Sequence, residues 1–174
     1  ELNRQLDKIG NIKSDGRPIL GLDVADMADL IWKVSKDFII VPAHAWTPWF
    51  AIFGSKSGYD SLEECYEDLT PHIRAIETGL SSDPIMNRRL SALDNITLVS
   101  NSDAHSTDNF GREANVMDLE NPTYEEILQT IRNKDRNKFL YTIEFYPEEG
   151  KYHADGHRDC DFMCEPEETE KLKG

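Results

Sequence analysis

The residues best suited to chemistry in this 174-residue sequence are histidines and carboxylates that directly follow short apolar runs. Three runs are followed in this way: His44 comes after 38–41, Glu77 and Asp83 after 73–76, and Asp103 and His105 after 96–99. Because Asp103 and His105 are two positions apart, their side chains point to the same side of an extended segment. Carboxylate oxygens and imidazole nitrogens both bind divalent metals. The pattern therefore indicates metal-dependent chemistry.

Each of these side chains also has an ordinary structural interpretation. Glu77 could be a strand-end cap acceptor for the next helix, and Asp83 before Pro84 fits a helix N-cap. Asp103 could lie in a polar turn and bond to its own backbone. A single histidine after a strand, such as His44, is more often a hydrogen-bonding core or loop residue than a metal ligand. The occurrence of such side chains after three separate runs favours a shared site, because the carboxyl ends of parallel strands meet on one face.

The elements that must position these residues read as an α/β fold in which helical periods alternate with β-branched runs. We expect helices over 22–34, 61–68 and 124–132 and from residue 84, and strands over 38–41, 73–76, 96–99 and 139–145. Asp23, Thr123 and the pair Ser61 and Glu64 are helix-start signals. Strands separated by helices predict a mostly parallel sheet, either open or closed into a barrel.

The long connection from Trp46 to Tyr59 is rich in aromatic residues and exceeds the usual length of such loops. Trp46, Trp49 and Phe50, close to Lys56, suit a surface that stacks on a base and binds a phosphate. The alternative is a local hydrophobic cluster, which is a frequent role of tryptophan.

Composition sets limits on the protein class. The formal charge of −14 argues against a protein that coats nucleic acid in general. It does not argue against a nuclease, because bound metal ions neutralise the negative charge of the carboxylates that hold them. No apolar run reaches the length of about 18 residues that a membrane-spanning helix needs, so no membrane partner is expected. Three cysteines are too few for a disulfide scaffold and predict a cytoplasmic location. Cys65 is expected to be a small buried residue.

The composition changes after Pro147, and we predict two parts, residues 1–147 and an acidic tail, residues 148–174. The tail holds His153, His157, Cys160 and Cys164, a spacing tighter than that of common zinc fingers. We expect half of a zinc site at most.

Several strings resemble the PHP (polymerase and histidinol phosphatase) metallophosphoesterases, and specifically their endonuclease Q branch. The strings are PAHAWTPWF at 42–50, FGSKSG at 53–58, ETGLSSDP at 77–84, NSDAH at 101–105 and GREAN at 111–115. The resemblance covers roughly residues 16–170. It implies a distorted β/α barrel of seven strands with up to three metal ions, which would be Zn, Mn or Mg. It also implies an endonuclease that nicks DNA on the 5′ side of deaminated bases and abasic sites.

The resemblance assigns roles by position. His44, Asp103 and His105 match metal ligands and are the expected catalytic residues. Asp83 stands six residues past Glu77, where many PHP enzymes place another histidine ligand, and Glu77 matches a family glutamate, so both are further candidate metal residues. Arg112 could bind phosphate, although a surface salt bridge is an equal alternative. Cys160 matches the first cysteine of the family's zinc-finger module, and Cys164 does not. The family's opening HxH motif and its next ligands have no counterpart in this sequence, so we expect the chain to be the later part of a barrel, inactive by itself.

Two alternatives stay open. A PHP phosphatase would act on a small phosphate ester and would need no exposed aromatic loop. A non-catalytic fragment would have an unoccupied, disordered ligand cluster and would show no hydrolysis with any divalent metal. Self-association of the chain, which would cover an open sheet edge, is also left open. The metal hypothesis requires His44 to lie within about a nanometre of Asp103 and His105.

Overall fold

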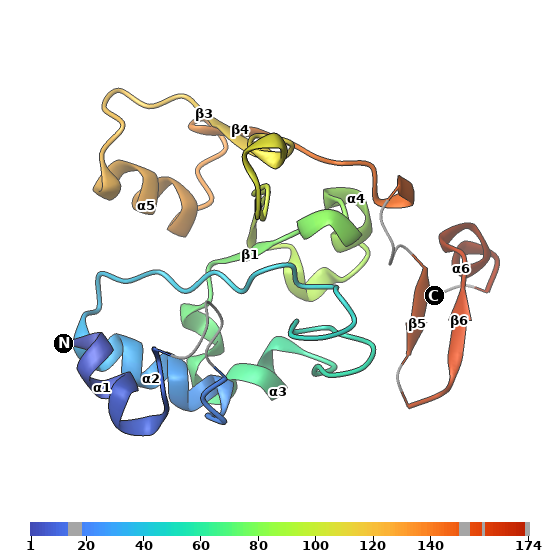
Figure 1. Cartoon of the computed structure of the whole chain (residues 1–174). Helices are drawn as coiled ribbons and strands as arrows, with labels where there is room; N and C mark the ends of the chain where they lie inside the picture. Colours follow the sequence, from blue (N-terminus) through green and yellow to red (C-terminus); the bar gives the residue numbers. More distant parts are fainter. Residues whose placement is uncertain (14–18, 150–153, 158, 173–174) are drawn as a thin grey trace.

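The computed structural model describes residues 1–13, 19–149, 154–157 and 159–172 (Figure 1). Its α-helices are α1 (Leu2–Ile9), α2 (Val24–Val34), α3 (Leu62–Tyr66), α4 (Pro84–Asn87), α5 (Tyr124–Arg132) and α6 (Pro166–Leu172). Its strands are β1 (Ala75–Glu77), β2 (Thr97–Val99), β3 (Ala114–Met117), β4 (Phe139–Ile143), β5 (Asp155–His157) and β6 (Phe162–Cys164). The mixed α/β composition agrees with the predicted class, and the strands form three two-stranded sheets in the described part of the chain.

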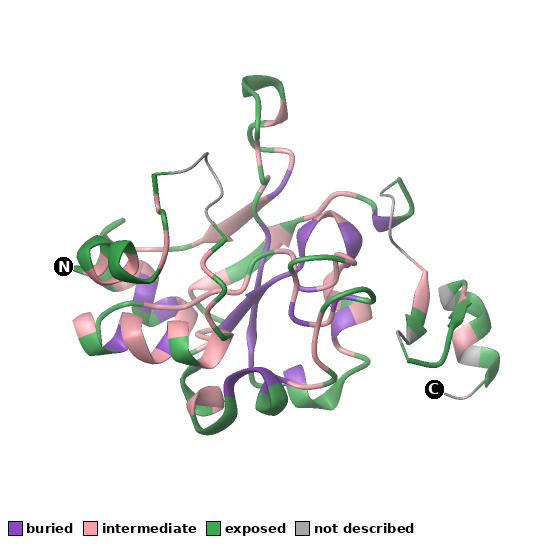
Figure 2. Ribbon diagram, turned by 60° about the horizontal axis from the view of Figure 1, so that its bottom comes forward, coloured by how far each residue is buried: buried purple, intermediate pink, exposed green. Residues whose placement is uncertain are grey.

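The parallel pair β1 and β2 forms the centre of the molecule. Ala75 pairs with Thr97 and Glu77 with Val99, and every residue of both strands is buried (Figure 2). The segment predicted as a first strand, 38–41, is not assigned as one. Instead, the chain just after it runs beside β1, because the Glu77 N–H donates to the Pro42 carbonyl and the Ala45 N–H donates to the Glu77 carbonyl, both at 3.0 Å.

The predicted last strand forms, but its direction is a correction to the parallel arrangement. β4 pairs antiparallel with β3, a strand that the sequence pattern did not predict. Asn115 of β3 joins this pair to the end of β2, because its side-chain amide exchanges two hydrogen bonds of 2.8 Å with the backbone of Ser100. A side chain thus takes the place of backbone pairing at this junction, and β2 and β3 belong to separate sheets.

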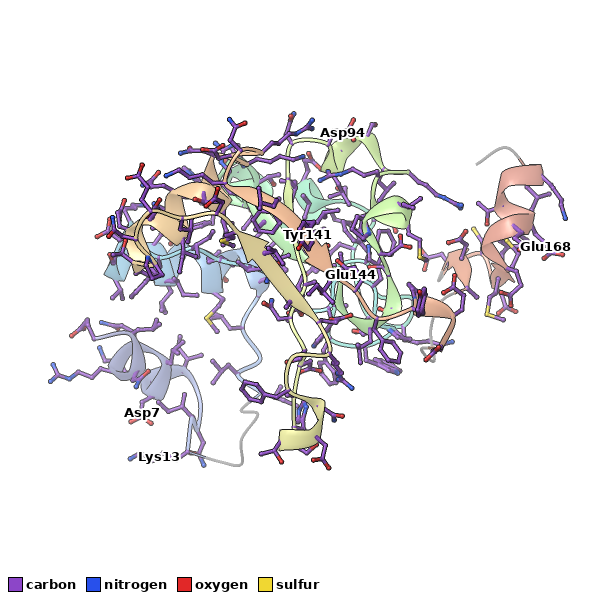
Figure 3. The ribbon with its side chains drawn as sticks, turned by 90° about the horizontal axis from the view of Figure 1, so that it is seen from above. Asp7, Lys13, Asp94, Tyr141, Glu144 and Glu168 are labelled. Atoms are coloured by element: carbon purple, nitrogen blue, oxygen red, sulfur yellow. The ribbon has the colours of Figure 1, made fainter. Side chains whose placement is uncertain are left out.

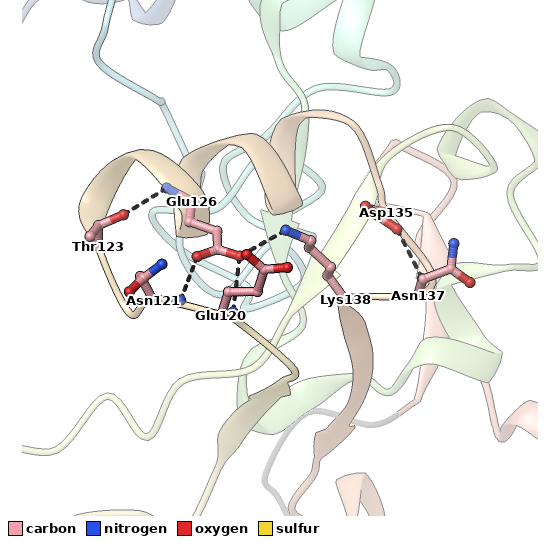
Figure 4. Close-up of polar contacts among 7 residues, drawn as sticks. All are labelled: Glu120, Asn121, Thr123, Glu126, Asp135, Asn137 and Lys138. Atoms are coloured by element: carbon pink, nitrogen blue, oxygen red, sulfur yellow. Dashed lines mark hydrogen bonds and ion pairs between the residues drawn. The ribbon is translucent and has the colours of Figure 1, made fainter.

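The helix starts follow the predicted caps. Asp23 accepts from the Ala25 N–H and begins α2, and Thr123 accepts from the Glu126 N–H and begins α5. The Glu126 carboxylate accepts from the backbone of Glu120 and Asn121 and from Lys138 at 2.7 Å, which ties α5 to both flanking segments (Figure 4). These bonds fix the connection between β3 and β4.

The capping box at α3 forms with one difference. The Ser61 hydroxyl accepts from the Glu64 N–H as predicted, but the Glu64 carboxylate accepts from the Asp60 N–H, one residue before the expected donor. Cys65 in this helix is buried, as predicted, and burial raises the pKa of its thiol to about 12.

A hydrophobic core joins α2 and α3 to the central strands. Fully buried members include Ile73, Ile76 and Leu93, with Ala28 and Trp32 contributed by α2. Among the described residues, none of the helices combines the length and the apolar character that crossing a bilayer requires.

The acidic tail contains a hairpin of β5 and β6 followed by α6, at one side of the molecule (Figure 1). Asp155 forms an ion pair with Arg89 at 3.5 Å and accepts a hydrogen bond from Thr169 of α6 at 2.6 Å. The tail is therefore connected both to the segment after α4 and to its own helix.

Candidate functional site

The carboxyl ends of β1 and β2 and the neighbouring segment 42–45 form one edge, which we call the carboxyl edge. Glu77 lies at its centre and is 7% exposed. Its carboxylate accepts from the His44 N–H at 2.7 Å and from the Asn101 side-chain amide at 2.8 Å. Both oxygens therefore have structural hydrogen bonds, but the donors lie in the segment 42–45 and after β2 rather than in the next helix, which the cap interpretation required.

His44 reaches this edge through an unusual backbone conformation. Its φ is +32°, a region that non-glycine residues seldom adopt. Gly79, with φ +65°, lies so close that an added Cβ would be 2.8 Å from the His44 Cβ. The imidazole Nδ1 lies 3.0 Å from the Thr47 hydroxyl. The turn after β1 must therefore carry glycine so that His44 can occupy its place.

Asp103 and His105 lie together in the loop after β2. The His105 Nδ1 is 2.9 Å from the Asp103 carbonyl oxygen and 3.8 Å from the Asp103 carboxylate. Both side chains are at least half exposed, and the φ of Asp103 is +42°. The predicted pair is therefore present as neighbours that face solvent.

The described side chains do not assemble a complete metal centre by themselves. In the described ranges, no three His, Cys, Asp or Glu side chains gather as a group that could hold a metal ion. Asp103 and His105 offer two ligands, and the carboxylate of Glu77 already accepts two hydrogen bonds. The ligand set implied by the PHP resemblance is thus incomplete within these residues.

In the described part of the chain, the neighbours of Asp83 and of the tail cysteines do not indicate a metal site. Asp83 caps α4, since its carboxylate accepts from the Met86 N–H at 2.7 Å. Cys160 is exposed and Cys164 lies 3.2 Å from the Thr169 hydroxyl. His153 lies outside the described residues, as does the side chain of His157. The predicted half site of zinc in the tail stays a prediction.

The aromatic loop divides into a packed part and an exposed part. Trp46 donates to the Asn87 side chain at 2.8 Å, and its ring lies 4.5 Å from that of Phe53 beside the core. In contrast, Trp49 and Phe50 are 57% and 78% exposed. Trp46 thus has the packing role that was the alternative for this loop, and only Trp49 and Phe50 are available to stack on a base.

Two further predicted contacts lie near these loops. Arg112 donates through Nε to the Ser102 carbonyl at 2.8 Å, so it braces the loop that carries Asp103. This backbone contact differs from the surface salt bridge considered for Arg112. Lys56 is exposed, and its backbone N–H donates to the Pro48 carbonyl at 2.9 Å. Its ammonium group is accessible from solvent.

Two glutamates, the buried Glu113 and the half-buried Glu144, were missed by the sequence reasoning. Glu113 is 3% exposed, and burial raises the pKa of its carboxyl to about 7. Burial also raises the pKa of Glu144, whose carboxylate accepts from the Thr78 hydroxyl at 2.9 Å. One oxygen of each carboxyl has no hydrogen-bond partner. Figure 3 shows Glu144 just after Tyr141 on the segment that contains β4. Glu144 is the one charged residue of the apolar run 139–145, and this feature of the sequence could have identified it.

Two proteins of known sequence resemble this chain. The uncharacterized protein YqxK of Bacillus subtilis (strain 168) is 31% identical over 122 residues, which are 70% of this chain and 31% of that protein. The uncharacterized protein MJ0043 of Methanocaldococcus jannaschii is 29% identical over 135 residues, 74% of this chain and 16% of that protein. No family model matches the sequence. The chain thus spans less than a third of each relative.

Two solved structures resemble the fold closely. The lesion-specific endonuclease PfuEndoQ from Pyrococcus furiosus matches with a TM-score of 0.78 and 33% identity, over 98% of this chain and 42% of that one. A complex of Endonuclease Q with a 27-mer duplex substrate that has an abasic lesion at the active site matches with a TM-score of 0.76 and 32% identity. That match covers 97% of this chain and 42% of the solved one. The fold is therefore similar to part of Endonuclease Q.

Proposed function

We propose that this chain carries part of a DNA repair endonuclease that cleaves on the 5′ side of deaminated or abasic sites. The observation that carries the proposal is the similarity of nearly the whole chain to the two Endonuclease Q structures. The carboxyl edge supplies consistent chemistry, because Asp103 and His105 lie together and face solvent. Residues 1–147 would contain this edge as part of a PHP-type barrel, and residues 148–174 would begin a zinc-binding module.

The exposed aromatic residues support a role in binding damaged DNA. An enzyme that acts on a lesion must accommodate a base outside the helical stack, and aromatic rings stack on any base. Trp49 and Phe50 project from the loop that begins beside His44, and Lys56 in the same loop could contact a phosphate. The loop and the Asp103 and His105 pair would then contact the same duplex.

Asp103 and His105 are proposed as metal ligands, with Zn²⁺ or Mn²⁺ as the expected ions. A bound divalent ion supplies a nucleophilic hydroxide near neutral pH and neutralises phosphate charge. Further ligands would have to join this pair from outside the described cluster, because the described residues bring only these two together. Arg112 would hold the loop in place through its bond to the Ser102 carbonyl.

Binding to a defined lesion tests the recognition half of the proposal. The chain is titrated against a labelled duplex with one abasic site and against the same duplex without it, and binding is followed by fluorescence anisotropy. We expect tighter binding to the damaged duplex and a loss of about tenfold for Trp49→Ala, since base stacking contributes about 1–3 kcal/mol. Equal affinity for both duplexes, unchanged in Trp49→Ala, would refute lesion recognition by this loop.

Cleavage tests the catalytic half and requires the natural protein that carries these residues. Asp103→Asn and His105→Gln are each expected to reduce nicking of the abasic duplex at least a hundredfold in the presence of Mn²⁺ or Zn²⁺, while binding changes little. Full nicking activity in both variants would exclude these side chains from the reaction. The matched control is Asp108→Asn, an exposed carboxylate in the same loop.

One observation favours a second candidate for the chain taken by itself. Because the described residues contain no cluster of three metal-ligating side chains, we propose that the chain alone binds DNA without cleaving it. Incubation of the chain with the abasic duplex and each of Mg²⁺, Mn²⁺ and Zn²⁺ is expected to give no nicked product. Metal-dependent nicking that Asp103→Asn abolishes would overturn this expectation.

A further inference from the structure

A groove of about 810 Å³ lies at the amino ends of β1 and β2, opposite the carboxyl edge. Four permanent cations line it: Lys36, Arg74, Arg132 and Lys134. We call it the amino-end groove. None of the described residues that line it is Asp or Glu, although acidic residues outnumber basic ones by 33 to 19 in the chain. This local excess of positive charge runs against the composition of the whole protein.

Two of these cations have structural roles. Arg132 lies at the end of α5 and donates to the carbonyls of Lys36 and Phe38, both at 3.0 Å. Lys134 donates to the Asp94 carbonyl. Positive side chains near helix C-termini are favoured by the carbonyls exposed there. Backbone capping therefore accounts for Arg132 and Lys134, and it also holds them in fixed positions at the groove.

The other two cations are not explained by capping. Arg74 stands directly before β1 and is exposed, and its guanidinium has no hydrogen-bond or ion-pair partner among the described residues. The Lys36 ammonium likewise contacts no carboxylate in that part of the chain. Like charges that share one concave surface repel each other, and a bound anion relieves this repulsion. Burial lowers the pKa of Lys134, and the nearby Arg88 and Arg136 lower it further, whereas the Asp94 carboxylate raises it.

The remaining lining matches a phosphate group with an attached ring or chain. Asn95 and Asn133 supply amide N–H donors beside the cations. Trp32 and His72 form a tilted aromatic pair with ring centroids 5.3 Å apart in the wall of the groove. Guanidinium groups recognise phosphate oxygens through paired N–H donors, and the fixed position of Arg132 reduces the entropy cost of binding.

We propose that the amino-end groove is a binding site for phosphate groups, separate from the carboxyl edge. Arg74 and Lys36 would contact the anion directly, and Arg132 would act from its fixed position at the end of α5. The phosphate could belong to a small polyphosphate or to the DNA backbone, and the shared chemistry is recognition of a multiply charged oxyanion. This inference does not depend on the proposed nuclease activity.

Isothermal titration calorimetry of the chain with inorganic pyrophosphate, in EDTA and at low ionic strength, tests the site. We expect measurable binding that weakens about tenfold in Arg74→Gln and again in Lys36→Gln, because a charge-assisted hydrogen bond is worth about a factor of ten. Binding is also expected to weaken as salt is added. The matched control is Lys171→Gln, which removes one positive charge from α6.

The two sources of phosphate are distinguished by competition. An undamaged 12-base-pair duplex that displaces pyrophosphate from the chain, but not from Arg74→Gln, assigns the site to the DNA backbone. Pyrophosphate binding that the duplex leaves unchanged assigns it to a small phosphate ligand. Absence of binding by both probes, or equal loss in Arg74→Gln and Lys171→Gln, overturns the proposal. Unchanged circular dichroism and thermal midpoints establish that each variant is folded.

Discussion

Replacing Glu113 by Gln is expected to stabilise the fold more at pH 8 than at pH 5. Glu113 is 3% exposed, one of its carboxyl oxygens has no partner, and burial raises its pKa to about 7. The nearby charges of Glu144 and Glu77 act in the same direction. Because the carboxyl of an unfolded chain ionises near its ordinary pKa, ionisation of Glu113 above pH 7 favours the unfolded state.

The magnitude follows from the two pKa values. For a group whose pKa is raised on folding, the stabilising contribution is complete below the ordinary value of 4.5 and is lost as pH rises through about 7. At about 1.4 kcal/mol per pH unit, the loss is about 3 kcal/mol at pH 8 and about 1 kcal/mol at pH 5. Gln cannot ionise and still offers an oxygen to the Phe145 N–H, which bonds to Glu113 at 3.3 Å. The variant should therefore gain about 2 kcal/mol relative to wild type between the two pH values.

Urea unfolding followed by circular dichroism at pH 5 and pH 8 measures this difference. The quantity of interest is the change in unfolding free energy caused by Glu113→Gln at pH 8, minus the same change at pH 5. Glu63→Gln, in the exposed first turn of α3, is the matched control and should give a difference near zero. If Glu113→Gln and Glu63→Gln gave the same difference, the carboxyl of Glu113 would not be ionised at a cost in the folded protein.

Four further substitutions test the backbone, a helix cap and the core through thermal or urea unfolding. Gly79→Ala should destabilise by about 2–3 kcal/mol, because its Cβ would meet the His44 Cβ at 2.8 Å and its φ is +65°. Gly111→Ala, with φ +74° and open space, isolates the backbone cost of about 1 kcal/mol, and equal losses would exclude the contact with His44. Thr123→Ala should lose about 1 kcal/mol through the N-cap of α5, and no loss would show that Glu126 and Lys138 fix this helix alone. Leu93→Ala, fully buried, should lose about 2–5 kcal/mol, and a loss below 1 kcal/mol would mean that the core refills the space.

The sequence predicted features that depend on neighbouring residues. Asp23 and Thr123 cap α2 and α5 because a cap requires only a side-chain oxygen and an N–H two or three residues later. The buried runs before Glu77 and Ser100 became β1 and β2 because apolar strands of that length must be covered on both faces. These signals are local, so they can be recognised in the sequence without knowledge of the tertiary structure.

The features that the sequence did not predict depend on distant contacts. β3 has half-buried residues and no clear alternation, and its position is set by the bonds of Asn115 to the backbone of Ser100. Residues 38–41 do not form the predicted strand, and the chain from Pro42 to Ala45 bonds to β1 instead, because the partner groups of β1 lie there. Burial of Glu113 likewise arises only when the chain around Phe145 packs over it. The pairing of Asp103 with His105 was accessible because it is local, whereas the place of His44 depends on Gly79.

The two edges of the central sheet carry opposite charges for a common physical reason. At the amino ends, helix-terminal and loop carbonyls need donors, and Arg132 supplies them to Lys36 and Phe38. At the carboxyl ends, backbone N–H groups need acceptors, and Glu77 accepts from His44. Arg74 adds a positive charge at the amino ends, and Asp103 adds a negative charge at the carboxyl ends. Among the described residues, neither of these side chains hydrogen-bonds to the backbone. Folding uses the charges of Arg132 and Glu77, and it leaves those of Arg74 and Asp103 available for a ligand. An anion is thus expected at one edge and a cation at the other.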